Sequence, residues 1–358
     1  MLNFYKKEQN LLVHFNIPVD NYSLTKLIIG HINHTYKVSG QRCFILQKIN
    51  TAIFKNPEGL MKNIEVIGKH LKRSDYPYEV LNIIKTKSDQ LFFRDTNGAC
   101  WRVFDFIKDS YSIDQVEYKE QAYQGGQVFG TLLSCLADLD VSKIVETIPN
   151  FHNWRLRWKA FEVAIENDLA QKSASISDFI QQVKSYEQWL KITLKTIAAD
   201  QLPIRITHND TKINNILFDQ KTRMVKAVID WDTIMPSTLI SDYGDMVRTF
   251  ANSSNEEEKD ISKVNFNFEK FTRLTDGFLS KIKRNITQQE QKNLVNGALI
   301  ITYIQTIRFL TDYLNGNTYY QTNYATQNLV RAKNQMHFFE QLFNNKLTME
   351  KYIKPKTL

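Results

Sequence analysis

Polar side chains suited to phosphate transfer gather in two short segments of the chain. Residues 208–215 have the sequence HNDTKINN, and residues 229–232 have the sequence IDWD. Transfer of a phosphoryl group from ATP needs a carboxylate to accept the proton of the attacking hydroxyl. It also needs a carboxamide and a second carboxylate to hold Mg2+ against the phosphates. Asp210, Asn215 and Asp230 supply these groups in that order, and oxygen ligands of this kind suit Mg2+.

The spacing within these segments strengthens this interpretation. Asp210 and Asn215 are five positions apart, which is the separation of the catalytic Asp and Asn in the protein-kinase loop. A hairpin predicted over residues 215–229 returns Asp230 toward the same place. Each residue alone is equally well explained as a turn, a cap or a polar strand end. The combination favours catalysis, with His208 orienting the loop rather than titrating.

The elements that must position these groups begin with a β-rich part. Residues 24–49 predict three antiparallel strands, and an apolar pattern at helical spacing after Pro57 predicts a helix that packs on them. Strand patterns at residues 91–94 and 99–107 flank an Asn-Gly turn, the strongest short hairpin signal. We expect this part to end near residue 108.

The rest of the chain is predicted to be mainly helical. The helical patterns cover residues 116–139, 154–165, 176–199 and several segments within 266–343, and a short strand at 204–207 precedes the hairpin. Gly125, Gly126 and Gly130 predict close packing between helices. The acidic run at residues 256–258 predicts a helix N-terminus, because the helix dipole favours negative charge there.

These elements predict an α+β fold with two lobes. Residues 1–108 form a β-rich nucleotide-binding lobe, and residues 109–358 form a helical lobe that carries the catalytic loop, the metal site and the substrate site. The expected ligand site is the cleft between the lobes.

Composition and charge exclude several classes of protein. The 358 residues carry a net charge of +8, and 42% of them are hydrophobic, which is ordinary for a globular protein. The basic residues are scattered, so we expect neither a nucleic-acid polymer nor a membrane as a partner. Three cysteines without a CxxC pair and an N-terminus without an apolar signal core predict a cytoplasmic location. No GxxxxGK[ST] motif occurs, so a P-loop is excluded.

The chain resembles the aminoglycoside phosphotransferase and choline kinase group, whose catalytic segment is HxDxxxxN followed by ID[WF][ED]. Residues 208–215, 227–236 and 242–248 carry the resemblance, and residues 30–36 and 46–50 extend it over most of the chain. Within the group, the sequence is most similar to the N-acetylhexosamine 1-kinases. The resemblance implies a bilobal, protein-kinase-like fold that binds ATP and Mg2+ in its cleft.

The resemblance also implies a role for each residue of the helical lobe's motif. Asp210 is the expected base, and Asn215 and Asp230 are the expected metal ligands. Lys212 resembles the cation that protein kinases place beside the transferred phosphoryl group.

In the β-rich part, the loop at residues 30–36 joins two strands and can turn backbone N–H groups toward a triphosphate. Gly30, Asn33 and Thr35 are its candidate nucleotide-binding residues. Phe106 lies in the apolar segment that resembles the kinase hinge, which holds adenine through backbone contacts.

The third strand departs from the kinase pattern. The phosphate-binding lysine of that strand aligns with Gln47, and Lys48 follows one step later. Side chains alternate between the faces of a strand, so only one of the two can face the cleft. Lys48 is the candidate cation, and Glu65 on the following helix is its expected partner.

For the acceptor, the resemblance to hexosamine kinases implies Arg308 on a late helix and Tyr319 further on, with Tyr320 able to exchange roles. Trp231 and His31 also suit a carbohydrate, which needs fixed polar groups for its hydroxyls and an aromatic face for its C–H side. With Asp210 they form the predicted acceptor site. The expected substrate is N-acetylglucosamine or N-acetylgalactosamine, phosphorylated on its anomeric hydroxyl to the sugar 1-phosphate.

Two alternatives remain open from the sequence. The acceptor can be another small alcohol, such as choline, homoserine, an aminoglycoside or a different sugar. Choline requires an aromatic cage and an aminoglycoside an acidic groove. Outside the enzymes, the chain can be a kinase-like binding module, and an assay of ADP release separates the two classes.

Overall fold

Six strands between Ser23 and Asp105 form one antiparallel sheet. The computed structural model describes residues 6–18, 20–27 and 32–356. The sheet contains β1 (Ser23–Leu27), β2 (His34–Ser39), β3 (Cys43–Lys48), β4 (Ile83–Ile84), β5 (Phe93–Arg94) and β6 (Cys100–Asp105). Their order is β1-β2-β3-β6-β4, and β5 pairs with β6. The three strands and the hairpin predicted from the sequence are confirmed, whereas the two-residue β4 was not predicted.

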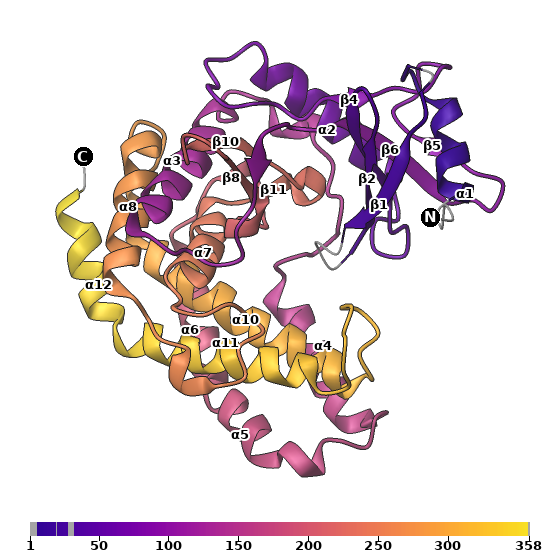
Figure 1. Cartoon of the computed structure of the whole chain (residues 1–358). Helices are drawn as coiled ribbons and strands as arrows, with labels where there is room; N and C mark the ends of the chain where they lie inside the picture. The colour runs from indigo at the N-terminus through magenta and orange to yellow at the C-terminus, as the bar shows by residue number, and fades with distance from the viewer. Residues whose placement is uncertain (1–5, 19, 28–31, 357–358) are drawn as a thin grey trace.

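Helix α2 (Pro57–Leu71) covers one face of this sheet. It begins where predicted because Pro57 occupies the first turn and the Asn56 side chain accepts a hydrogen bond from the Gly59 N–H at 2.9 Å. Its apolar stripe, which includes Leu60 and Ile64, joins the main hydrophobic core. The opposite face of the sheet packs in a second core, with α1 (Lys6–Gln9) and the following 3-10 turn on its outer side (Figure 1).

The remainder is mainly helical, and it fills the other end of the molecule in Figure 1. Its helices are α3 (Lys119–Cys135), α4 (Trp154–Asn167), α5 (Ser177–Ser185), α6 (Glu187–Ala199), α7 (Leu239–Phe250), α8 (Phe268–Ile282), α9 (Gln288–Lys292), α10 (Leu294–Leu314), α11 (Gln327–Asn344) and α12 (Lys346–Ile353). The α+β class with a small antiparallel sheet and a larger helical part is confirmed.

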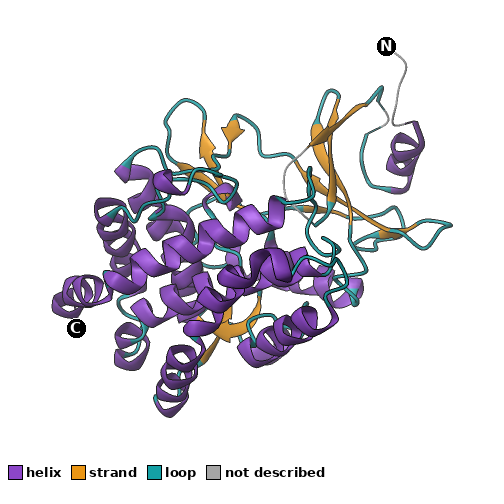
Figure 2. Ribbon diagram, turned by 90° about the horizontal axis from the view of Figure 1, so that it is seen from below, coloured by secondary structure: helices purple, strands orange, loops and turns teal. Residues whose placement is uncertain are grey.

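Two small sheets lie within the helical part, as Figure 2 shows. One contains β7 (Ser110–Tyr111), β9 (Ile216–Asp219) and β10 (Val225–Val228), and the other pairs β8 (Ile204–Thr207) with β11 (Met235–Thr238). The predicted hairpin is therefore confirmed as β9 and β10. Strand β7 comes directly after the first lobe and pairs with β9, so the connection between the lobes ends on this hairpin.

Glycines bring the helices of this part close together, as predicted. A Cβ atom on Gly126 of α3 would lie 2.2 Å from the carbonyl oxygen of Leu274 on α8, so only glycine permits this approach. Helix α10 is long and apolar enough to cross a membrane by length and composition, but 78% of its apolar window is buried in the core.

Two sequence predictions in this part were wrong. The predicted helix at 176–199 is divided into α5 and α6 at Tyr186. The acidic run at 256–258 starts no helix, because the carboxylates of Glu256 and Glu257 pair with Arg248 and Arg331 of neighbouring helices.

Candidate active site

The loop after β8 is held by a buried carboxylate. Asp242 at the start of α7 accepts the backbone N–H of His208 at 2.8 Å and that of Asn209 at 2.6 Å, and its carbonyl accepts the Thr211 hydroxyl at 2.7 Å. The ring of His208 lies 3.2 Å from the carbonyl oxygen of Ile229 in the returning hairpin. Burial lowers the pKa of His208 to about 4, so the imidazole is neutral and acts as a support, as the sequence predicts.

Asp210, Asn215 and Lys212 meet within this loop. The Asn215 amide donates to Asp210 Oδ2 at 2.9 Å, and Lys212 Nζ lies 3.2 Å from the same oxygen. Burial alone would raise the pKa of Asp210, but the charge of Lys212 and the Asn215 hydrogen bond outweigh it and hold the pKa below its ordinary value. Asp210 is therefore an ionised carboxylate, a quarter exposed, at the cleft wall.

Asp230 is brought to the same place by the hairpin. The Ile229 N–H donates to the Asn215 carbonyl at 2.9 Å, which fixes the end of the hairpin to the catalytic loop. Asp230 then takes a left-handed backbone conformation with φ of 59° and opens onto the cleft. Desolvation by the surrounding cleft walls, together with the charges of Asp232 and Asp210, raises its pKa to about 7. A surplus of negative charge is thus concentrated around Asp230.

This donor set fits Mg2+. Among the residues that the structure describes, no group of three or more His, Cys, Asp or Glu side chains forms a complete metal site. Mg2+ does not need one, because it usually takes one or two carboxylates and completes its shell with phosphate oxygens and water. The Asn215 amide uses its nitrogen for Asp210, so its oxygen is the atom left for a metal, and both Asn215 and Asp230 line the cleft.

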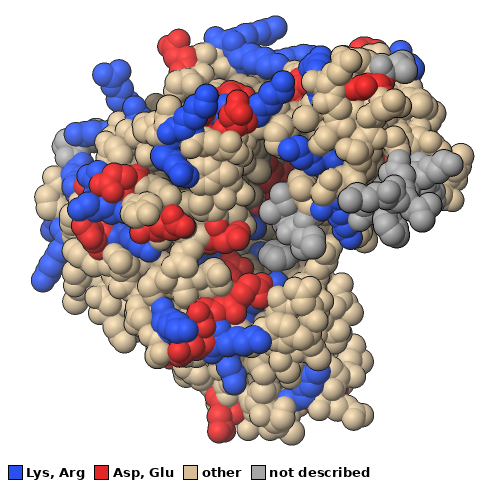
Figure 3. All heavy atoms as spheres, in the orientation of Figure 1, with Lys and Arg blue, Asp and Glu red and all other residues tan. Residues whose placement is uncertain are grey.

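These groups line a cleft between the two lobes, where Figure 3 shows acidic atoms inside the hollow. From the sheet, Asn33, Thr35 and Phe106 face the cleft, as predicted. The Phe106 N–H is already donated to the Cys43 carbonyl, so adenine would meet the ring of Phe106 or its carbonyl. The predicted residues Gly30 and His31 lie outside the described residues.

Strand β3 turns Gln47 toward the cleft and Lys48 away from it. Ile45 and Gln47 line the cleft, while Phe44 and Leu46 pack in the second core on the opposite face, where alternation also places Lys48. The expectation that Lys48 binds phosphate is therefore wrong.

The expected partner of Lys48 is also engaged elsewhere. Glu65 pairs with Lys62 at 3.0 Å and with Lys69 at 2.8 Å on its own helix. Trp231, a predicted sugar contact, borders the cleft. It is 1% exposed, and its indole N–H donates to the Val228 carbonyl at 2.9 Å, which supports the hairpin end, so its contact with a sugar stays a prediction.

The far end of the cleft is formed by Arg308 and aromatic rings. The Arg308 guanidinium lies 4.8 Å from the ring centre of Phe151 and 5.6 Å from that of Tyr320, and it donates to Gln305 at 3.0 Å. Tyr320 lines the cleft, whereas Tyr319 packs edge-on against Tyr320 behind it. Tyr320, which the sequence offers as the alternative to Tyr319, is therefore the tyrosine that lines the cleft.

Asp312 fixes the backbone of these tyrosines. Its carboxylate is 4% exposed and accepts the N–H groups of Thr318 at 2.8 Å, Tyr319 at 2.8 Å and Tyr320 at 2.9 Å. The Asn328 amide of α11 donates to the same carboxylate at 2.8 Å. The sequence shows no motif for this arrangement, because it depends on a loop closing over the end of α10.

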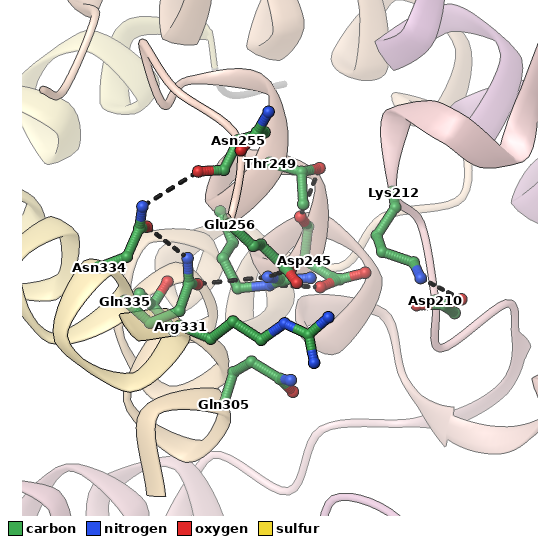
Figure 4. A network of polar contacts seen from close by, with 12 residues as sticks. Asp210, Lys212, Asp245, Thr249, Asn255, Glu256, Gln305, Arg331, Asn334 and Gln335 are labelled. Atoms are coloured by element: carbon green, nitrogen blue, oxygen red, sulfur yellow. Dashed lines mark hydrogen bonds and ion pairs between the residues drawn. The ribbon is translucent and has the colours of Figure 1, made fainter. Parts of the chain in front are cut away.

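A further polar network forms the wall beside Lys212 (Figure 4). Arg248 of α7 donates to Asp245 at 2.7 Å and to Gln335 of α11 at 3.2 Å, and it pairs with Glu256. Asp245, Arg248 and Glu256 line the cleft. The network ties the segment after α7 to α11, which explains why the acidic run does not begin a helix.

Sequence reasoning also missed a buried ion pair between the lobes. Arg102 of β6 lies 2.7 Å and 2.8 Å from the two carboxylate oxygens of Asp232, two residues beyond Asp230. Asn33 donates to the same carboxylate at 2.7 Å, and the Thr147 hydroxyl donates to the Asp232 carbonyl at 2.7 Å. Only the strand pairing reveals that Arg102 faces the cleft.

Comparison with known proteins supports this geometry. A family model described as the phosphotransferase enzyme family matches residues 23–264, which include the sheet, the catalytic loop and the hairpin.

Solved structures share the fold over almost the whole chain. A microcompartment-associated aminopropanol kinase is 15% identical, with a TM-score of 0.62 over 96% of this chain and 98% of that one. A spectinomycin phosphotransferase in complex with ADP and spectinomycin is 14% identical, with a TM-score of 0.59 over 94% and 97%. An amicoumacin kinase with AMP-PNP and Ca2+ is 12% identical, with a TM-score of 0.60 over 95% and 94%. The fold is thus the bilobal kinase-like one that the sequence predicts.

Proposed function

We propose, on the premise that the chain belongs to the phosphotransferase enzyme family, that it transfers the γ-phosphate of ATP to a hydroxyl group of a small molecule. The observation that carries the proposal is the convergence of Asp210, Asn215 and Asp230 on one wall of the interlobe cleft. A cytoplasmic location remains a prediction of the sequence.

The chain's own residues account for each part of this reaction. Asp210 is ionised and accepts the proton of the acceptor hydroxyl. The hydroxyl oxygen attacks the γ-phosphorus, and the bond between the γ-phosphorus and the bridging oxygen of the β-phosphate breaks, which releases ADP. Lys212 lies beside Asp210 and offers a positive charge to the transferred group. Asn215 and Asp230 would hold Mg2+, which neutralises the charge that develops on the phosphate oxygens.

For the acceptor, we propose the anomeric hydroxyl of an N-acetylhexosamine. Among the described residues, Arg308 contacts the Gln305 amide oxygen and aromatic rings rather than a carboxylate, so its positive charge can serve a carbonyl or hydroxyl oxygen of the acceptor. The rings of Phe151 and Tyr320 beside it offer apolar faces to the C–H side of a sugar. Desolvation, followed by the charges of Arg308 and Arg157, lowers the pKa of His152 to about 3. This end of the cleft is therefore unfavourable for an ammonium group.

The second candidate is a kinase for another small alcohol. The cleft also contains Asp245 and Glu256 on the α7 side, and such carboxylates are able to receive an amine. Both carboxylates pair with Arg248, however, which neutralises part of their charge. This pairing favours the uncharged sugar over choline or an aminoglycoside.

The test is ADP release from ATP and Mg2+ against a panel of N-acetylglucosamine, N-acetylgalactosamine, plain hexoses, choline, homoserine and kanamycin. We expect release with an N-acetylhexosamine, accompanied by loss of its reducing end, which locates the phosphate at C1. Release with choline or kanamycin alone would refute the sugar assignment and leave the kinase assignment intact. ATP binding without release for any alcohol would instead indicate a binding module.

A further inference from the structure

Strand β3 presents no cation to the cleft, although protein kinases carry a lysine on the corresponding strand. In those enzymes a lysine of the third strand contacts the α- and β-phosphates and pairs with a glutamate of the following helix. Here β3 presents the uncharged Gln47 to the cleft. Glu65 of α2 is engaged with lysines of its own helix. A nucleotide bound in this cleft therefore needs positive charge from a different element of the sheet.

Arg102 fills this place from the neighbouring strand. It lies directly opposite Gln47 in the antiparallel pairing of β3 and β6, and opposite residues point to the same face of a sheet. Its Nε donates to Gln47 Oε1 at 3.0 Å. Of the cleft-lining residues that the structure describes before residue 108, Arg102 is the one with a basic side chain.

The partners of Arg102 fix its guanidinium and leave one donor available. Both Nη atoms contact the carboxylate of Asp232, and Nη1 also lies 3.7 Å from the sulfur of Met61. With the Gln47 contact, these interactions account for four of the five N–H groups of an arginine. The remaining N–H belongs to Nη2.

The stability of the fold alone does not explain the buried ion pair of Arg102 and Asp232. Arg102 and Asp232 are 1% and 2% exposed. The free energy needed to remove two charges from water is about as large as the free energy gained from their attraction. Apolar residues of the same volume would hold the lobes together at least as well. A buried arginine at the wall of a phosphate-binding cleft has a use that an apolar residue lacks.

We propose that Arg102 is the cation that binds the α- and β-phosphates in this protein, with Asp232 in the positioning role that a helix glutamate has in protein kinases. The inference rests on the proposed function, since it assumes a nucleotide in the cleft. Because Asp232 follows Asp230 by two residues, one turn of the chain sets both the metal ligand and the phosphate-binding cation.

The test compares the binding of ADP and of adenosine in the presence of Mg2+, measured by titration calorimetry on the full chain. Adenosine has no phosphate, so a lost phosphate contact changes only the ADP affinity. For Arg102→Gln we expect the dissociation constant of ADP to rise ten- to a hundredfold and that of adenosine to stay within twofold. Equal losses for both ligands, or no loss for ADP, would overturn the inference.

A second variant restores the charge from the other strand. Gln47→Lys combined with Arg102→Gln places a lysine where other kinases have one, and we expect it to recover at least tenfold of the lost ADP affinity. Should Arg102→Gln fail to fold by circular dichroism, the double variant and Arg102→Lys replace it. Both retain a cation, so both should favour ADP over adenosine as the unmodified protein does, and loss of that preference would overturn the inference.

The matched control is Arg94→Gln. Arg94 of β5 pairs with Glu58 at 2.8 Å, is exposed and does not line the cleft, so ADP binding should remain unchanged. The outcomes also separate the two proposals. If the unmodified protein binds no ADP, the proposed function fails. If it binds ADP and Arg102→Gln binds it equally well, only the role of Arg102 fails.

Discussion

Replacing Asp312 with asparagine should loosen the tyrosine loop of the acceptor wall without touching the catalytic groups. The carboxylate accepts hydrogen bonds on both oxygens, from the N–H groups of Thr318 and Tyr319 and the Thr318 hydroxyl on Oδ1, and from Tyr320 and Asn328 on Oδ2. An amide has one oxygen, so at least two of these donors would face an NH2 group that cannot accept.

The magnitude follows from these contacts. Hydrogen bonds to a charged group contribute about 1.5–3 kcal/mol each, so the loss of two amounts to about 3–6 kcal/mol if the loop does not relax. Part of this loss should appear as local opening of the loop that carries Tyr320, since the loop lies at the surface end of α10. For each 1.4 kcal/mol that acceptor binding must supply to close the opened loop, the affinity for the acceptor falls about tenfold.

The assay is steady-state kinetics together with thermal unfolding. For Asp312→Asn we expect the acceptor KM to rise at least tenfold, the ATP KM to stay within twofold, and the thermal midpoint to fall by several degrees. Asp168→Asn is the control, because Asp168 accepts the N–H groups of Lys172 and Ser173 outside the cleft. It should lose stability with an unchanged acceptor KM. Equal acceptor KM values for Asp312→Asn and the unmodified protein would refute the reasoning.

Three further predictions concern the catalytic loop and its surroundings. Asp210→Asn should reduce turnover by about three orders of magnitude in the ADP-release assay while ATP binding survives, because only the proton acceptor is lost; retained turnover would contradict its role as base. Asp230→Ala should abolish the Mg2+-dependent part of ATP binding in calorimetry, and an unchanged affinity in Mg2+ would count against it as a ligand. His152 has a pKa of about 3 in the fold against about 6.5 when unfolded, so the unfolded state binds the proton first and stability falls as pH drops below 6.5. His152→Gln should therefore lose about 1.4 kcal/mol less unfolding free energy than the unmodified protein between pH 7.5 and pH 5.5 in urea titrations, and equal losses would contradict the lowered pKa of His152.

Local patterns predicted the catalytic loop well. The spacing between Asp210 and Asn215 is set by one short turn, and the hairpin before Asp230 follows from neighbouring residues. The strands and α2 were also predictable, since alternation and the Pro57 cap are properties of adjacent positions. The roles of the individual site residues stay predictions until the variants above are measured.

Contacts between distant segments explain what the sequence did not reveal. Alternation showed that only one of Gln47 and Lys48 faces the cleft, but the choice depends on which face of β3 meets the second core. The position of Arg102 on the cleft face follows from its register with Gln47, 55 residues earlier. Glu256 was taken for a helix start because its partner Arg248 comes from a helix that the charge pattern did not indicate.

The contacts of Asp232 have a consequence for any movement of one lobe against the other. Its carboxylate bonds Asn33 and Arg102 of the sheet lobe, while its own backbone belongs to the helical lobe. Any movement that parts the two lobes at this point has to break all of these bonds together, since they converge on one side chain.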